Sequence, residues 1–335
     1  MEYYGTLGPG CKEPETLKRM LLTGMTGLRL NLSHGSLPRQ ASFLAAWQQA
    51  REETGSNAGL LLDLEGPELR IGSLPEPLLL SPGEALLLGA GGIPIPPALL
   101  PWLIPGQEVR LDDGKLLLRV ESGGSTAAFC RVVRGGLLSS RKSLALPGSP
   151  VRLPALTEAD RQNLRLASQA GVTGVMLPFV HAPEDIRELE QALEDAGVPQ
   201  LRIFAKLEDA EGLRRLPELA PLGHTIVIAR GDLGNALKPW ELPRAQKEAA
   251  RICRLWNTPF LVVTQLLDSM EQRSVPTRAE VLDIFNAVLD GASALMLTGE
   301  TAAGKYPVQA MDIRVKTGEE ALRYRAESLC PPTGR

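Results

Sequence analysis

The sequence predicts an α/β fold, a (β/α)₈ barrel interrupted by a small inserted all-β domain. Two observations support this prediction: eight short apolar segments alternate with helical patterns, and one long stretch between them lacks that alternation. We place the barrel at residues 1–72 and 152–335, and the β-rich insertion at 73–151. The 335-residue chain less the 79 residues of the insertion leaves 256 residues, and such a barrel typically has roughly 250. An open, doubly wound parallel sheet is the competing architecture.

The segments before the insertion already show the alternation. They predict, in order, a strand at Tyr3–Leu7, a helix at Pro14–Thr23, a strand at Gly27–Asn31, a helix at Pro38–Glu53 and a strand at Gly59–Leu64. The last of these strands is almost entirely leucine, as is typical of a strand buried on both faces of a parallel sheet.

The insertion differs in composition from both flanks. Residues 73–105 contain eight prolines and show no helical period. Asp112-Asp113-Gly114 separates two apolar runs, Glu108–Leu111 and Leu116–Val120, and this arrangement predicts a hairpin. A further strand is expected at Thr126–Val133.

The alternation resumes after Pro154. Thr157 should begin a helix, because acidic residues follow it in the first turn. Five more strands are predicted at Gly174–Leu177, Leu201–Leu207, Thr225–Ala229, Phe260–Thr264 and Ala294–Leu297. The remaining helices are predicted at about 183–196, 210–219, 242–256, 278–290 and 307–326.

Composition narrows the class of protein. The formal net charge of −3 provides no basic field for nucleic acid or anionic lipid. The four cysteines lie far apart and form no CxxC pair, which argues against a zinc knuckle or a disulfide framework. We see no signal-peptide pattern at the N-terminus and no membrane-spanning apolar run, so we expect a cytoplasmic protein.

Polar residues follow the predicted strands at the end where barrel enzymes carry their active sites. Arg29, Asn31 and Ser33 alternate along the second strand and should share one face. Lys206 and Glu208 alternate in the same way at the end of the fifth strand. Further polar residues at strand ends are Asp63 at the end of strand three, Gly231 and Asp232 after strand six, and Thr264 at the end of strand seven.

These residue types suit an anionic, metal-chelating substrate. Glu208 and Asp232 could hold Mg²⁺, which takes one or two protein carboxylates and completes its shell with water and substrate oxygens. Lys206 and Arg29 could bind a phosphate, and the backbone of Gly231 and Asp232 could donate to a carboxylate. Structural interpretations stay open for each group, because strand-end carboxylates are often solvated and Asn or Ser often caps a helix.

Several sequence blocks, taken together and in order, resemble the pyruvate kinase family. They are Thr6-Leu7-Gly8-Pro9, Arg29-Leu30-Asn31-Leu32-Ser33-His34-Gly35, Gly66-Pro67-Glu68-Leu69-Arg70, Ala229-Arg230-Gly231-Asp232-Leu233-Gly234, Thr264-Gln265-Leu266-Leu267-Asp268-Ser269-Met270, Pro276-Thr277-Arg278-Ala279-Glu280, Asn286-Ala287-Val288-Leu289-Asp290-Gly291 and Gly299-Glu300-Thr301. The insertion resembles the lid domain of that family. The resemblance implies a TIM barrel and the glycolytic reaction that converts phosphoenolpyruvate and ADP to pyruvate and ATP.

The resemblance also implies roles in catalysis. Glu208 and Asp232 would bind Mg²⁺, and Lys206 and Arg29 would contact the phosphoryl group in transit. Gly231 and Asp232 would hold the substrate carboxylate through their N–H groups, and Thr264 would assist protonation of the enolate.

Further implied roles concern K⁺ and the nucleotide. Asn31, Ser33, Asp63 and the carbonyl oxygen of Leu64 would bind K⁺. Glu68 accompanies K⁺ dependence in this family, so K⁺ dependence is predicted. Arg70 and His34 would face the phosphates of ADP or ATP.

The sequence departs from the family pattern at several positions. Glu65 stands where the family usually has Lys, and Pro178-Phe179-Val180-His181 replaces Ser-Phe-Ile-Arg. Val275 replaces an Arg before the Pro-Thr-Arg-Ala-Glu block, and Asn235-Ala236 replaces Val-Glu. The sequence ends near the point where the family's regulatory domain would begin, so we expect a short form without that domain. A homodimer through the barrel is possible.

Two other functions stay open. The first is a metal-dependent 2-oxo-acid lyase or decarboxylase on the same barrel, because one Mg²⁺–carboxylate site can stabilise an enolate without a nucleotide. The second is a metabolite-binding or regulatory protein that has lost catalysis, which Glu65 and Pro178 motivate.

Overall fold

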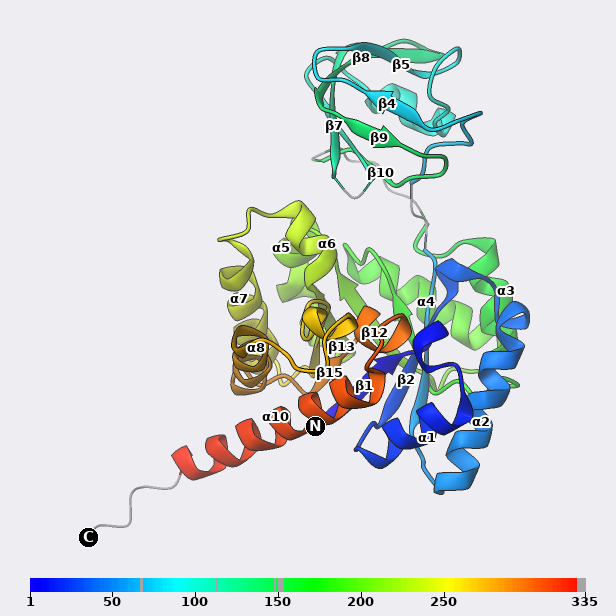
Figure 1. The fold of residues 1–335 in the computed structure, drawn as a ribbon. Helices are drawn as coiled ribbons and strands as arrows, with labels where there is room; N and C mark the ends of the chain where they lie inside the picture. Colours follow the sequence, from blue (N-terminus) through cyan, green and yellow to red (C-terminus); the bar gives the residue numbers. More distant parts are fainter. Residues whose placement is uncertain (67–68, 113, 148, 150–153, 330–335) are drawn as a thin grey trace. The chain divides into compact units, whose positions relative to one another are not determined.

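A computed structural model describes residues 1–66, 69–112, 114–147, 149 and 154–329. It separates the chain into two compact units. The barrel unit comprises Met1–Gly66 and Ala155–Arg335, and the β unit comprises Pro67–Pro154. Figure 1 shows the elements of both units along the chain.

The barrel unit is a closed barrel of eight parallel strands, in the order β1-β15-β14-β13-β12-β11-β3-β2. Strand β1 pairs with both β2 and β15, so the barrel closes between the first and last strands. The strands are β1 Glu2–Thr6, β2 Gly27–Asn31, β3 Gly59–Asp63, β11 Gly174–Leu177, β12 Arg202–Leu207, β13 Thr225–Ala229, β14 Phe260–Val263 and β15 Ala294–Met296. The predicted (β/α)₈ barrel is therefore confirmed, and the open sheet is wrong.

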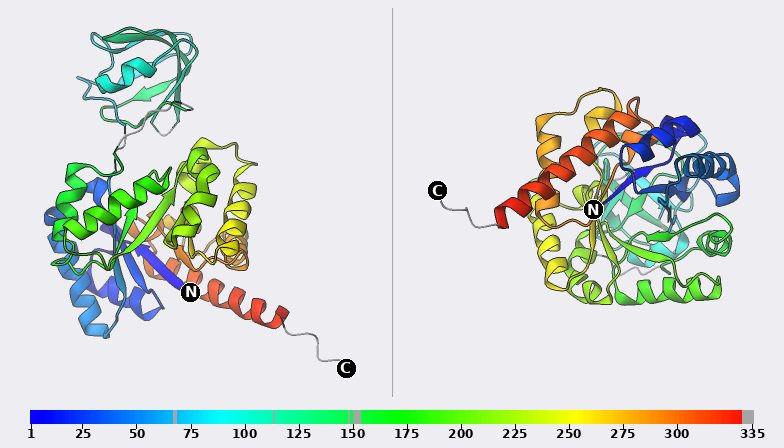
Figure 2. Two further views of the ribbon diagram at one scale, coloured as in Figure 1. Left: turned by 180° about the vertical axis from the view of Figure 1, so that it is seen from behind. Right: turned by 90° about the horizontal axis from the view of Figure 1, so that it is seen from below.

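Helices ring these strands (Figure 2, right). They are α1 Pro14–Leu22, α2 Ala41–Thr54, α3 Glu158–Leu166, α4 Pro183–Asp195, α5 Ala210–Leu219, α6 Arg230–Ala236, α7 Leu242–Leu255, α8 Arg278–Leu289, α9 Gly299–Ala302 and α10 Pro307–Leu329. Two helices start on capping boxes: Thr157 with Asp160 begins α3, and Thr277 with Glu280 begins α8.

A separate apolar cluster fills the inside of the barrel. It contains one or two alternate residues from seven of the strands: Tyr4, Leu61, Met176, Phe204, Val227, Ala229, Leu261, Val263, Ala294 and Met296. Because strand side chains alternate, Thr6, Asp63 and Lys206 lie on the same inward side, one step nearer the C-terminal ends of their strands. The packed interior therefore forms the floor beneath the polar residues.

The β unit is built from antiparallel strands. One sheet has the order β10-β6-β7-β8-β5, and β4 pairs with β9. The strands are β4 Leu78–Leu80, β5 Ala85–Gly89, β6 Glu108–Leu111, β7 Leu116–Ser122, β8 Ala127–Arg134, β9 Gly136–Leu138 and β10 Leu144–Ala145. The predicted hairpin joins β6 to β7, with Asp112 and Gly114 at positive φ; Asp113 lies outside the described residues.

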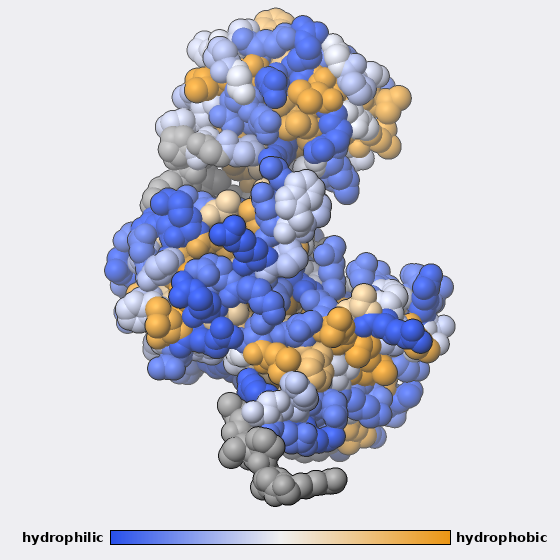
Figure 3. All heavy atoms as spheres, turned by 90° about the vertical axis from the view of Figure 1, so that its left-hand side faces the viewer, coloured by the Kyte–Doolittle hydropathy of each residue, from blue (hydrophilic) through white to orange (hydrophobic). Residues whose placement is uncertain are grey.

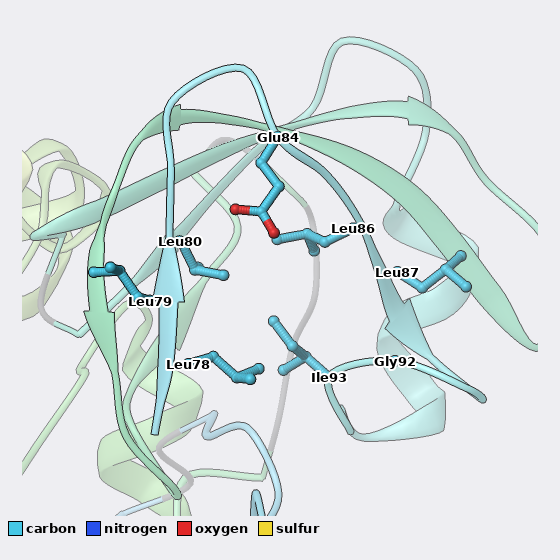
Figure 4. Close-up of a pocket in the computed structure, with 8 residues that line it drawn as sticks. All are labelled: Leu78, Leu79, Leu80, Glu84, Leu86, Leu87, Gly92 and Ile93. Carbon is cyan, nitrogen blue, oxygen red and sulfur yellow. The ribbon is translucent and has the colours of Figure 1, made fainter. Parts of the chain in front are cut away.

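A groove in the β unit lies between β4 and β5 (Figure 4). Leu78, Leu80, Leu86 and Ile93 point toward its centre, whereas Leu79 points away. The carboxylate of Glu84 lies at one end and accepts a hydrogen bond from the N–H of Ser81, 2.8 Å away. This mainly apolar lining does not suit a phosphorylated metabolite.

Apolar side chains also gather on the face of the barrel unit that carries α7, α8 and α10 (Figure 3). The exposed apolar residues of these helices include Leu255, Leu282 and Tyr324, and Trp256, which directly follows α7, is exposed as well. Among the residues that the structure describes, no helix has both the length and the apolar character needed to cross a bilayer.

Candidate active site

The barrel brings the predicted residues of strands β2, β3 and β12 into one charged group. Asn31 and Asp63 are paired residues of β2 and β3. Lys206 belongs to β12, which is separated from β3 by β11, yet its Nζ lies 3.3 Å from Asp63 Oδ1. The same ammonium lies 2.8 Å from Glu208 Oε1. We call Arg29, Asp63, Lys206 and Glu208 the charge network.

Arg29 completes this network from the other side. Its Nε donates to Asp63 Oδ2 at 2.8 Å, and its Nη2 donates to the same oxygen. Its Nη1 donates to the hydroxyl of Thr6 at 3.3 Å. Asp63 is 2% exposed and Lys206 only 14%, so these charges compensate one another largely out of water.

The pKa shifts follow from this arrangement. Burial alone would lower the pKa of Lys206, but the carboxylates of Asp63 and Glu208 outweigh it and raise the pKa above its ordinary value. Burial would raise the pKa of Asp63, but Lys206 and Arg29 outweigh it and lower the pKa. Lys206 is therefore a fixed cation and Asp63 a fixed anion across the physiological range.

Glu208 is held in place by a residue that the sequence did not suggest. Its Oε2 accepts a hydrogen bond from the N–H of Phe179, 2.8 Å away. Phe179 follows β11 and has φ of 51°, a conformation that is uncommon for a bulky residue. Nothing in the sequence indicated this backbone donor.

The donor set fits a divalent cation of the Mg²⁺ type. The register pairs Leu207 with Ile228, so Glu208 lies near the end of β13, and Asp232 follows in the first turn of α6. Glu208 is buried, whereas Asp232 is exposed. Among the described residues, no group of three or more His, Cys, Asp or Glu side chains could hold a metal. Two carboxylates suffice for Mg²⁺, which keeps several water or substrate ligands.

The residues predicted to hold K⁺ are partly engaged elsewhere. Asn31 Oδ1 accepts a hydrogen bond from the N–H of Ser33 at 3.1 Å and thereby caps a short turn, as the capping interpretation anticipated. Asp63 Oδ1 is buried and accepts no hydrogen bond from the described residues, although Lys206 lies 3.3 Å away. The charge of this oxygen is thus compensated by the Lys206 ammonium. Leu64, the residue that follows Asp63 in the sequence, is buried, whereas Ser33 is exposed.

The sequence predicted that Thr264 is the last residue of its strand. In the structure β14 ends at Val263, so Thr264 lies just beyond it. It has φ of 71°, and Gln265 after it has φ of 52°. Two successive non-glycine residues in this region, one of them β-branched, each cost roughly 1–3 kcal/mol. The positive φ of Thr264 ends the strand one residue before the predicted end. The Thr264 hydroxyl donates to the carbonyl oxygen of Val263 at 2.6 Å.

Arg230 lies against this strained turn, and no sequence pattern suggested a role for it. Arg230 is 6% exposed, and its guanidinium donates to the carbonyl oxygens of Thr264 and Gln265. A Cβ added at Gly231 would lie 3.5 Å from Thr264 Cγ2, so the threonine side chain faces Gly231 across a space that a methyl group would fill. Gly231 and Asp232 lie in the first turn of α6.

The predicted nucleotide residues are less well defined. Arg70 belongs to the β unit, where its Nη1 donates to the carbonyl oxygen of Arg141 at 2.9 Å. His34 lies in the short turn Leu32–His34, but its side chain falls outside the described part of the structure, as does all of Glu68. The contact of Arg70 and His34 with a nucleotide therefore stays a prediction.

Comparison with known proteins agrees with the motif order. A family model described as "Pyruvate kinase, barrel domain" matches residues 2–89 and 97–311. A pyruvate kinase of Chlamydia pneumoniae is 38% identical over 317 residues, covering 92% of this chain and 66% of its own. One of Aeropyrum pernix is 37% identical over 330 residues, covering 98% and 71%. One of Geobacillus stearothermophilus is 34% identical over 335 residues, covering 96% and 57%. The chain thus spans about two thirds of the length of these relatives.

Proposed function

Because this chain belongs to the pyruvate kinase family, we propose that it is a phosphotransferase that moves the phosphoryl group of phosphoenolpyruvate to ADP and releases pyruvate and ATP. The observation that carries the proposal is the charge network. Lys206 lies within ion-pair distance of both Asp63 and Glu208 at the strand ends, with Arg29 on the far side of Asp63. This is a buried, preorganised set of charges beside carboxylates that can chelate a metal.

The chain's own cations act on the group in transit. Phosphoryl transfer needs little covalent chemistry from a protein, and its barrier falls mainly through positioning and charge stabilisation. Lys206 and Arg29 provide positive charge for the equatorial oxygens of the phosphoryl group. Asp63 fixes both cations before the substrate arrives, so little reorganisation is needed during the reaction.

Glu208 and Asp232 would hold Mg²⁺, which would supply Lewis-acid stabilisation of charge on the substrate oxygens. The N–H groups of Gly231 and Asp232 bind the carboxylate of the substrate. Thr264 then assists delivery of a proton to the enolate carbon. Arg29, Lys206, Gly231, Asp232 and Thr264 together form the substrate site.

K⁺ would be held by Asn31, Ser33, Asp63 and the carbonyl oxygen of Leu64. The chemistry of these donors supports this proposal, because amide, hydroxyl, carbonyl and carboxylate oxygens suit a hard cation. The nucleotide would meet Arg70 and His34. A cytoplasmic location and a homodimer through the barrel complete the proposal.

The test is a coupled assay of pyruvate formation from phosphoenolpyruvate, with ADP, Mg²⁺ and K⁺ each omitted in turn. Turnover that needs both ADP and Mg²⁺ supports the proposal, and loss of turnover without K⁺ supports the K⁺ site. Release of pyruvate or CO₂ from a 2-oxo acid without ADP would instead support a lyase or decarboxylase. Substrate binding without any turnover would indicate a protein that has lost catalysis.

A further inference from the structure

The guanidinium of Arg230 joins two loops of the proposed site. Arg230 begins α6, the helix that carries Gly231 and Asp232. Its Nε and Nη2 donate to the carbonyl oxygen of Thr264 at 3.2 and 2.7 Å, and Nη2 also donates to the carbonyl oxygen of Gln265 at 3.1 Å. One side chain thereby ties the start of α6 to the turn after β14.

The other edge of the guanidinium is anchored behind the barrel. Its Nη1 donates to Asp283 Oδ2 on α8 at 2.7 Å and to Gln246 Oε1 on α7 at 3.4 Å. Gln246 in turn donates to Asp290 Oδ2 at 3.4 Å. Because these partners lie on two helices of the outer ring, the planar guanidinium has a single orientation in which all its contacts form.

The carbonyl oxygens that Arg230 binds belong to the two residues in the strained turn. Thr264 and Gln265 both have positive φ, a conformation that such residues rarely adopt and that persists only where surrounding contacts impose it. The three hydrogen bonds from Arg230 reach both residues, and the Thr264 side chain faces Gly231. The position of the Thr264 hydroxyl therefore depends on Arg230.

We propose that Arg230 is a positioning residue for enolate protonation: it holds the Thr264–Gln265 turn so that the Thr264 hydroxyl can pass a proton to the substrate carbon. The inference rests on the function proposed above. In this step the hydroxyl gives its proton to C3 of the enolate, and the carbon–carbon π pair forms the new C–H bond. The C2–O bond becomes a carbonyl, and the threonine oxygen regains a proton from water.

A purely structural role for Arg230 makes a different prediction. A buried arginine that only stabilises the barrel would, when replaced, lower stability and slow every step alike. A positioning role predicts that proton transfer at C3 suffers more than phosphoryl transfer. It also predicts that the loss disappears when Thr264 has no hydroxyl to position.

The experiment is a double-mutant cycle with Arg230→Lys and Thr264→Val in the full chain. Exchange of the C3 protons of pyruvate into deuterated buffer is followed by NMR, with Mg²⁺, K⁺ and inorganic phosphate present, and ATP formation is measured in parallel. We expect Arg230→Lys to slow exchange by about tenfold or more, with a change in KM for phosphoenolpyruvate below about threefold. In the Thr264→Val background, Arg230→Lys should cause no further loss of exchange.

Equal losses of exchange in the wild-type and Thr264→Val backgrounds would overturn the proposal, as would unchanged exchange in Arg230→Lys. Arg314→Lys is the matched control, since Arg314 is also a buried guanidinium bound to backbone carbonyl oxygens, those of Tyr4 and Leu295. It should lower thermal stability without selectively slowing exchange.

Two further arms keep the outcomes separable. If Arg230→Lys does not fold, Asp283→Asn releases the outer edge of the guanidinium and should give a smaller loss, about two- to fivefold, in the same cycle; the same loss without the Thr264 hydroxyl would again overturn the proposal. If the wild-type chain shows neither turnover nor exchange, the proposed function fails and the inference fails with it. If the wild-type chain is active but Arg230→Lys leaves the ratio of exchange to ATP formation unchanged, the inference alone is rejected.

Discussion

The residues of the proposed site at the C-terminal ends of the barrel strands form two halves, and each half is held in place by different interactions. On one side, the charge network fixes its members through ion pairs between side chains, centred on Lys206 and Asp63. On the other side, Thr264 and Gln265 are fixed through their backbone, which Arg230 clamps at positive φ. The first half, which we call the charge half, thus presents charged side chains. The second, which we call the backbone half, presents the positioned hydroxyl of Thr264. The difference suggests that each half serves a separate step of the proposed reaction.

The largest expected effect tests the charge half. Replacing Lys206 with Met removes the cation shared by Asp63 and Glu208, and turnover should fall by about 10³-fold or more. The fold should persist, because Asp63 retains Arg29, although the free energy of unfolding should fall by roughly 3 kcal/mol. The coupled assay and circular dichroism measure these two quantities.

Lys316→Met is the control for that variant. Lys316 pairs with Asp312 at 2.8 Å within helix α10, and its side chain is 70% exposed. Its replacement should leave turnover close to that of the wild type. Near-normal turnover in Lys206→Met itself would break the comparison, since the charge half would then do no chemistry.

A backbone restraint also exists beside the charge half, and it uses a carboxylate. Asp160 is fully buried and accepts hydrogen bonds from the N–H groups of Glu65, Gly66 and Thr157 and from the Thr157 hydroxyl. Asp160→Asn keeps the shape but replaces one acceptor oxygen with a donor. We expect the free energy of unfolding to fall by about 2–3 kcal/mol in urea titrations. A loss below about 0.5 kcal/mol would show that these N–H groups find other partners.

Gln265 tests whether the backbone half is strained. At φ of 52°, glycine should be at least as favourable, so Gln265→Gly should leave the free energy of unfolding unchanged or raise it by up to about 1 kcal/mol. Gln191→Gly, within helix α4, should instead lower it by about 1 kcal/mol. Equal destabilisation of both variants in thermal or urea unfolding would show that the turn at Gln265 stores no strain.

The smallest effect concerns pH at the edge of the charge half. His181 lies 2.8 Å from Asp209, and this hydrogen bond raises the pKa of His181 despite burial, which lowers it. Protonated His181 therefore stabilises the fold at pH below about 6.5, the ordinary histidine value, and this contribution is lost as the pH rises through the raised pKa. Both side chains are partly exposed, so the contribution should be below about 1 kcal/mol.

The measurement compares His181→Gln with the wild type in urea titrations across this pH range. The difference in free energy of unfolding should be larger at pH 5.5 than at pH 9, by less than about 1 kcal/mol. A difference that is constant across the range, or that grows with pH, would contradict the assigned direction.

The same contrast explains what could be predicted from the sequence. The alternation of Lys206 with Glu208, and of Arg29 with Asn31, is enough by itself to place these side chains on shared faces. The barrel itself followed from eight apolar segments, and most strand and helix bounds agree within one or two residues. These features depend on residue type and spacing, which the sequence states directly.

The backbone half depends on dihedral angles, which residue type did not reveal. Thr264 is β-branched and so favours a strand, yet contacts with Arg230 hold it at positive φ. The donor to Glu208 is a backbone N–H, that of Phe179, and no side-chain pattern could have indicated it. The short helices α6 and α9 were missed for a related reason, because seven and four residues are too few to show a period.

The most direct test of the two-half account measures both steps in variants of both halves. ATP formation from phosphoenolpyruvate and ADP, and NMR-detected exchange of the C3 protons of pyruvate, would be followed for Lys206→Met and Thr264→Val. The account predicts that Lys206→Met loses far more ATP formation than exchange, and that Thr264→Val loses far more of its exchange than Lys206→Met does. If both variants lose the two activities by the same factor, the halves do not serve separate steps and the account is wrong.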